Sequence, residues 1–137
     1  EFKIGKASLM REGKDVTIIA CGHMVDKAIK AAEKLNSKNI QARIIDLHTP
    51  KPIDKEAIAK AAKETGAILT VEEHTIHGGM GSAVAEVVVE EYPVPMELVG
   101  TRDEFGVSGE PDELYEHFGL SEDSIARKAE ELITRKT

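Results

Sequence analysis

Short runs of β-branched and other apolar residues alternate along this chain with longer segments of helical periodicity. Residues 16–20 (Val-Thr-Ile-Ile-Ala) form one such run, and residues 42–47 and 67–71 contain two more. Continuous apolar runs of this length are typical of strands buried on both faces of a parallel sheet. Parallel neighbours need a right-handed crossover, which usually carries a helix. The alternation therefore predicts an α/β fold, specifically a three-layer α/β/α sandwich.

Between the runs, apolar residues recur at spacings of three and four, the period of an amphipathic helix. One such stripe consists of Val25, Ala28, Ile29, Ala32 and Leu35. A second helix is expected between Asp54, a typical N-cap residue, and Gly66, a typical residue after a helix end. A third stripe begins at Met80, although its run of valines at 87–89 also suits a strand.

Further elements are expected towards both ends of the chain. Residues 7–10 and 96–99 are predicted to be short strands. Pro111 suits the first turn of a helix that ends at Gly119, and Ser121 is expected to cap the last helix. No composition break, low-complexity stretch or repeat divides the sequence, so residues 1–137 are expected to form one domain.

Charge and cysteine content exclude several classes of function. The 18 Lys and Arg residues against 25 Asp and Glu give a formal net charge of −7, which argues against nucleic acid or a membrane as a partner. One cysteine allows no internal disulfide, which fits a reducing compartment. The apolar runs are far shorter than the roughly 20 residues of a membrane-spanning helix. We therefore expect a soluble, cytoplasmic domain.

Candidate functional side chains follow three of the expected strands. In an open α/β sheet, ligands gather beyond the carboxyl ends of the strands. These ends carry residues 21–23 (Cys-Gly-His), 46–48 (Asp-Leu-His) and 72–74 (Glu-Glu-His). Cys21 precedes a helix, whose dipole lowers a thiol pKa, so Cys21 and His23 could form a nucleophile and base. No other residue completes such a site, and a small buried residue in a strand-to-helix turn is the favoured interpretation.

Glu73, His74 and His77 offer one carboxylate and two imidazoles to a metal ion. Zinc enzymes commonly place two histidines at i and i+4 on a helix, whereas this pair has i, i+3 spacing in an expected loop. Hydrogen bonding within the loop, or packing at an interface, is therefore the favoured role of these three residues.

A glycine-rich turn precedes the third predicted helix. Gly78, Gly79, Gly81 and Ser82, with Gly22 and His23 on a neighbouring turn, could present backbone N–H groups to an anion or a regulatory ligand. The turn matches neither the dinucleotide fingerprint nor the phosphate loop of nucleotide triphosphatases. The same glycines also permit a tight turn and close packing of the helix on the sheet, which is the favoured interpretation.

Several segments together resemble the C-terminal domain of transketolases. They are residues 15–20 (DVTIIA), 49–54 (TPKPID), 71–74 (VEEH) with 78–84 (GGMGSAV), 103–109 (DEFGVSG) and 119–121 (GLS). Because they follow in family order from about Gly5 to Leu132, the resemblance covers nearly the whole chain. It is closest to prokaryotic transketolases, including those made as two subunits. The related domains of 1-deoxyxylulose-5-phosphate synthase and of the β subunit of 2-oxo-acid dehydrogenase E1 are the alternatives.

The resemblance implies a five-stranded mixed sheet, mostly parallel, with its first strand antiparallel to the others. It also implies that the chain is a fragment of a thiamine-diphosphate enzyme of the pentose phosphate pathway, which transfers two-carbon ketol units between sugar phosphates. In that family thiamine diphosphate and Mg²⁺ are held by the first two domains, so no catalytic, cofactor-binding or metal-binding residue carries over to this chain.

The roles implied for such a domain are packing and contacts with the remaining transketolase domains or subunit, within a homo-oligomer of the parent enzyme, and regulatory ligand binding. Two functions of other classes stay open. One is a free-standing anion- or nucleotide-binding module at Gly22–His23 and Gly78–Ser82, and the other is an independent metal-dependent enzyme built on Glu73, His74 and His77. The missing initiator Met and the missing Gly-Asp-Gly cofactor signature favour the fragment.

Overall fold

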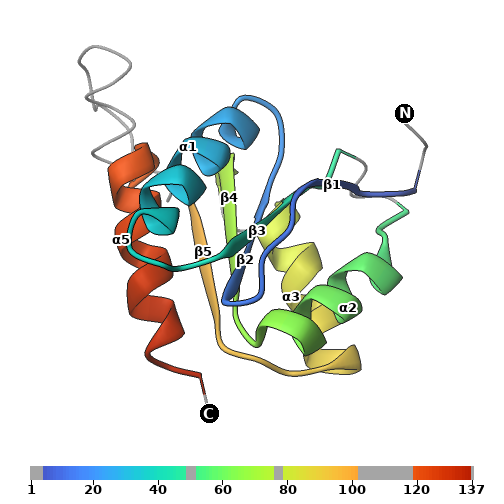
Figure 1. Cartoon of the computed structure of the whole chain (residues 1–137). Coiled ribbons are helices and arrows are strands. Elements are labelled where there is room, and N and C mark those ends of the chain that lie inside the picture. Colours follow the sequence, from blue (N-terminus) through green and yellow to red (C-terminus); the bar gives the residue numbers. More distant parts are fainter. Residues whose placement is uncertain (1–4, 49–51, 76–78, 102–118, 137) are drawn as a thin grey trace.

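The computed structural model describes residues 5–48, 52–75, 79–101 and 119–136, which form one sheet with helices on both faces (Figure 1). The strands are β1 (Ser8–Arg11), β2 (Val16–Ala20), β3 (Ala42–Asp46), β4 (Ile68–Thr75) and β5 (Met96–Thr101), and the helices are α1 (Met24–Asn36), α2 (Lys55–Thr65), α3 (Met80–Glu91) and α5 (Glu122–Ile133). The strand order is β1-β3-β2-β4-β5. Only the β1–β3 pair of this sheet is antiparallel, which confirms the predicted mixed sheet.

The hydrophobic core consists of two layers, one on each face of the sheet. All five residues of β2 are buried, because successive side chains of a strand point to opposite faces and helices cover both. Ile18 packs in the layer under α1 and α5, whereas its neighbour Ile19 packs in the layer under α2 and α3. This arrangement confirms the three-layer sandwich that the apolar runs predict.

The helix ends follow from short-range chemistry. The Asp54 carboxylate accepts a hydrogen bond from the Ala57 N–H (3.1 Å) and a second one from the Ala7 N–H (2.9 Å). Gly66 ends α2 in the left-handed conformation, with φ of 75°. Ser121 caps α5 by accepting from the Ser124 N–H at 3.2 Å. All three predicted helix signals are confirmed.

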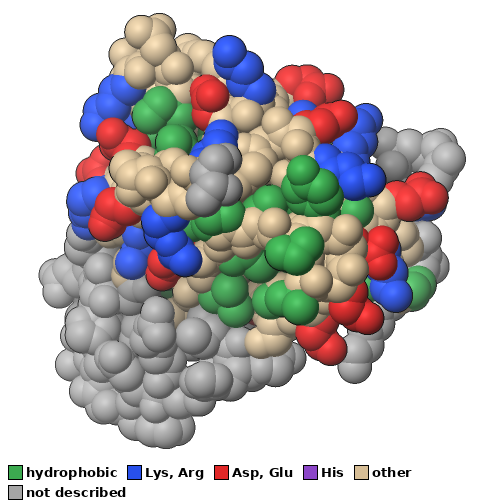
Figure 2. All heavy atoms as spheres, turned by 90° about the horizontal axis from the view of Figure 1, so that it is seen from below, with side chains coloured by type: hydrophobic (Ala, Val, Ile, Leu, Met, Phe, Trp, Pro, Cys, Tyr) green, Lys and Arg blue, Asp and Glu red, His purple; other side chains and the backbone are tan. Residues whose placement is uncertain are grey.

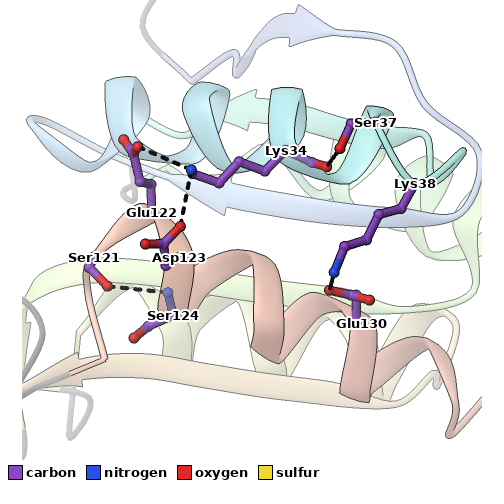
Figure 3. Close-up of polar contacts among 8 residues, drawn as sticks. All are labelled: Lys34, Ser37, Lys38, Ser121, Glu122, Asp123, Ser124 and Glu130. Atoms are coloured by element: carbon purple, nitrogen blue, oxygen red, sulfur yellow. Dashed lines mark hydrogen bonds and ion pairs between the residues drawn. The ribbon is translucent and has the colours of Figure 1, made fainter.

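Ion pairs connect α1 to α5 across the surface of the molecule (Figure 3). Lys34 Nζ lies 3.1 Å from Asp123 and 3.7 Å from Glu122, and Lys38 Nζ lies 3.0 Å from Glu130. The hydrogen bond with Asp123 raises the pKa of Lys34. Because all these side chains are at least partly exposed, the buried layer beneath them holds the helix pair together more than the charges do.

The structure confirms one ambiguous helix and lengthens two predicted strands. The valine run at 87–89 lies in α3, as the helical stripe from Met80 predicts. β4 continues to Thr75, so Glu72, Glu73 and His74 lie inside the strand and not in a loop after it. Pairing of Thr75 with Thr101 of β5 extends both strands beyond their apolar runs. The predicted helix from Pro111 and the segment 103–109 lie outside the described residues.

Among the helices that the structure describes, none has the length and hydrophobicity needed to cross a membrane.

Candidate functional site

The carboxyl ends of β2, β3 and β4 meet at one edge of the sheet. Ala20 of β2 lies beside Asp46 of β3 on one side and beside Val71 of β4 on the other. The chain leaves β2 through Cys21, while β4 continues with Glu72 and Glu73. The structure therefore gathers Cys21 and three carboxylates at this edge, as the sequence predicts.

This edge contains the point at which the strand order reverses. From β2 the chain passes through α1 to β3 on one side, and from β4 it passes through α3 to β5 on the other. Helix α1 covers one face of the sheet and α3 covers the opposite face (Figure 1). A reversal between β2 and β4 is the position at which open α/β sheets bind ligands.

The carboxylate of Glu72 occupies the start of α3. Its Oε1 accepts from the Met80 N–H at 2.8 Å and its Oε2 accepts from the Gly81 N–H at 2.7 Å. Glu72 is 1% exposed, and no side chain of the N-cap residue Gly79 could take this role. The negative charge also interacts favourably with the positive end of the helix dipole. Two N–H groups of the turn that could have bound an external anion are thus bound by the protein itself.

Gly81 is required by close packing of α3 on the sheet. A Cβ atom at this position would lie 2.7 Å from Thr70 Oγ1 and 3.1 Å from both Glu72 Oε2 and Leu98 Cδ2. This geometry supports the packing interpretation of the glycine-rich turn at Gly81. Ser82 follows in α3 and is partly buried, whereas Gly78 lies outside the described residues.

The second turn of the predicted anion site follows β2. Gly22 has a φ of +60°, a conformation that side chains other than glycine rarely adopt, and nothing lies within 4 Å of where its Cβ would be. His23 is the exposed N-cap residue of α1, and its side chain makes no capping hydrogen bond. Anion or regulatory binding at Gly22, His23 and the start of α3 remains a prediction.

Cys21 lacks the activation that its position before α1 suggested. Burial raises the pKa of the thiol, and the nearby carboxylates of Glu72, Asp46 and Glu73 raise it further. Desolvation and three negative charges act against the lowering that a helix dipole produces. A thiol that keeps its proton is a poor nucleophile. This supports the interpretation of Cys21 as a small residue in a strand-to-helix turn over that of a nucleophile.

The proposed metal ligands are only partly described. Glu73 is half-buried in β4, His74 belongs to the same strand, and His77 lies outside the described residues. Within the described part of the chain, no group of three His, Cys, Asp or Glu side chains could hold a metal ion. The loop or interface role of Glu73, His74 and His77 stays a prediction.

Sequence comparison links the chain to proteins of known activity. The family model "Transketolase, C-terminal domain" matches residues 5–125. A 6-deoxy-6-sulfo-D-fructose transketolase subunit of Clostridium sp. (strain MSTE9) is 50% identical over 99% of this chain and 42% of the relative. One subunit of the apulose-4-phosphate transketolase of Phocaeicola vulgatus is 45% identical over 98% of this chain and 43% of the relative. The 1-deoxy-D-xylulose-5-phosphate synthase of Heliobacterium modesticaldum is 43% identical over 94% of this chain and 20% of its own length.

Solved structures show the same relationship. A split-gene transketolase, described as an inactive β4 tetramer, has a TM-score of 0.94 and 45% identity, and the match covers 99% of this chain and 45% of that one. A transketolase mutant from Pichia stipitis has a TM-score of 0.70 and 20% identity over 95% of this chain and 18% of its own, which shows the fold alone. The chain thus spans less than half the length of each of these relatives.

Proposed function

Since the chain belongs to the family of transketolase C-terminal domains, we propose that it is the non-catalytic C-terminal domain of a transketolase. The parent enzyme transfers two-carbon ketol units between sugar phosphates. The observation that carries the proposal is the extent of the match. Two relatives named as transketolase subunits match nearly all of this chain, and the chain covers only 42% and 43% of them.

The residues at the start of α3 and around Cys21 do not fit the cofactor that we propose for the parent enzyme. A diphosphate needs free N–H or cationic donors, and the Met80 and Gly81 N–H groups at the start of α3 already bind Glu72. The charged groups around Cys21 are carboxylates, which repel a diphosphate. We therefore assign thiamine diphosphate and Mg²⁺ to the other domains of the parent.

A calorimetric titration tests this assignment. The 137-residue chain titrated with thiamine diphosphate and Mg²⁺ is expected to show no micromolar binding, because Glu72 already occupies the Met80 and Gly81 N–H groups at the start of α3. The intact parent enzyme serves as the positive control and should bind the cofactor. Micromolar binding by the chain alone would contradict the assignment.

The reaction itself is tested on the intact parent enzyme. We expect transfer of a two-carbon ketol unit from a ketose phosphate to an aldose phosphate. Formation of 1-deoxy-D-xylulose 5-phosphate in place of transfer would instead support the synthase alternative, since one such synthase is 43% identical over 94% of this chain. The named relatives act on different sugars, so a panel of sugar phosphates and sulfosugars is the appropriate substrate set.

The proposal includes partners and cellular setting. We propose that the domain packs against the remaining transketolase domains or subunit, in a homo-oligomer of the parent in the cytoplasm, acting in the pentose phosphate pathway. The names of the relatives support the first part, since two are subunits and a third is a β4 tetramer. Regulatory anion binding at the strand reversal would add to this role. Its described residues are Gly22, His23, Gly79, Gly81 and Ser82.

A further inference from the structure

A pocket of about 220 Å³ lies between helix α2 and strands β1 and β3, which form its floor. Leu9 of β1 pairs with Ile45 of β3. Ala7 and Arg43 lie two residues before them in their respective segments, so the four side chains share one face of the sheet and line the pocket. The floor is therefore apolar except for one guanidinium group.

The opposite wall is one stripe of α2. Ala57, Lys60 and Glu64 recur at spacings of three and four, so they lie on the same side of this helix and all line the pocket. Ala57 continues the apolar surface of the floor. Lys60 and Glu64 are exposed and bring one charge of each sign to the rim.

Arg43 is a buried cation, and the described residues bind only some of its N–H donors. It is 8% exposed, its Nε donates to the Gly13 carbonyl at 3.1 Å, and its Nη2 lies 2.8 Å from Glu64 and 3.9 Å from Glu12. A guanidinium group has five N–H donors, and the described residues provide no hydrogen-bond partner for Nη1. Because Arg43 lines the pocket, an acceptor placed there could form a charge-assisted hydrogen bond with its guanidinium group.

We propose that this pocket binds a small organic carboxylate with a short apolar chain. Arg43 and Lys60 would bind the carboxylate, and Leu9, Ile45 and Ala57 would contact the apolar chain. The volume equals that of about seven water molecules in the liquid, which suits a ligand well below drug size. Glu12 and Glu64 add negative charge beside Arg43, so a single carboxylate is preferred over a doubly charged phosphate.

This site is separate from the carboxyl edge of β2 and β4. None of the residues that line the pocket belongs to the group at Cys21, Asp46 and Glu72. Occupation of the pocket would connect β1, β3 and α2. The Ala7 N–H, which donates to Asp54, already links the residue before β1 to the N-cap of α2. Ligand binding there is expected to raise the melting temperature of the domain.

Calorimetric titration of the intact parent polypeptide with sodium hexanoate tests the proposal. We expect a dissociation constant on the order of 1 mM. Lys60→Gln should weaken hexanoate binding about threefold, and Ala57→Phe should abolish it by filling the pocket. Lys63→Gln is the matched control, since Lys63 is an exposed lysine of the same helix that does not line the pocket.

Two further measurements keep the test decisive. Hexanamide has the same shape without the charge and should bind at least about tenfold more weakly, since it cannot form a charge-assisted pair. Leu9→Asp places a negative charge at an exposed pocket residue and should weaken hexanoate binding even where Ala57→Phe fails to fold. Absence of hexanoate binding to the wild type, equal binding of hexanamide, or unchanged binding by Leu9→Asp would each overturn the proposal.

Discussion

At the residue scale, Glu72 is the most deeply buried charged residue of the described chain. It is a carboxylate almost without solvent exposure, and the two oxygens accept separate backbone N–H groups of α3. Such a group is stable in the interior only while both hydrogen bonds persist. The residue therefore couples the end of β4 to the start of α3.

We predict that Glu72→Gln destabilises the domain by about 2 kcal/mol, because a neutral amide offers only one acceptor oxygen to two N–H donors. Urea unfolding of the variant would measure the loss. Glu73→Gln is the control, since Glu73 is only half-buried in the same strand and should change stability by less than about 0.5 kcal/mol. Equal stability of the two variants would show that the Glu72 hydrogen bonds contribute little.

Cys21 gives a prediction of pH dependence. Burial and three carboxylates raise its pKa in the folded state, so the unfolded chain loses the thiol proton at lower pH than the folded chain. The stability that Cys21 contributes is therefore complete below the unfolded thiol pKa of about 8.5 and is lost as the pH rises through the folded pKa. Alkylation by iodoacetamide should show a midpoint above that of a free cysteine peptide.

Removal of a charge next to Cys21 provides the matched variant for this measurement. Glu72→Gln should move the alkylation midpoint down, since the Glu72 charge is one of the causes of the raised pKa. A midpoint at or below the peptide value in the wild type would mean that the helix dipole prevails after all.

At the element scale, α3 can approach the sheet closely because its second residue has no side chain. We predict that Gly81→Ala destabilises the domain by about 1–2 kcal/mol. The added methyl group would overlap Thr70 Oγ1, and the cost of this overlap should exceed the stability gained from the higher helix propensity of alanine. Thermal melting would measure this loss. Glu86→Ala, an exposed substitution on the same helix, should leave the melting temperature nearly unchanged.

At the scale of the whole molecule, several large apolar side chains of the described chain are exposed, namely Leu9, Met10, Val89 and Tyr92. Seen from below, hydrophobic side chains also gather in the middle of one face, with acidic and basic side chains around them (Figure 2). Apolar surface with a charged margin is typical of protein contacts, which agrees with the proposed packing on other domains or subunits.

Val89 tests the contacts of the assembly without disturbing the core. It is 69% exposed on α3, so Val89→Glu should leave the melting temperature of the isolated domain unchanged. The same change should weaken assembly of the parent enzyme, which sedimentation velocity would detect as smaller species. Glu90→Gln, at the adjacent exposed position, is the control and should assemble normally.

The sequence by itself determines features that depend on near neighbours along the chain. Apolar runs such as Val16–Ala20 specify strands buried on both faces, and Asp54, Gly66 and Ser121 place helix ends through contacts within four residues. The resemblance of the motifs to a family adds the antiparallel first strand, which local patterns alone do not reveal.

Only the tertiary structure decides which distant groups meet. Glu72 binds the N–H groups of Met80 and Gly81 because β4 and α3 pack together, and the sequence showed only a carboxylate eight residues before a glycine-rich helix start. Burial in the assembled domain and carboxylates from two neighbouring strands raise the pKa of Cys21, whereas the sequence showed only a cysteine before a helix. Arg43 likewise meets Gly13 and Glu64 only once β1, β3 and α2 are assembled. Electrostatic and packing energies depend on distance in space, whereas a sequence reports distance along the chain, and the two agree only within a few residues.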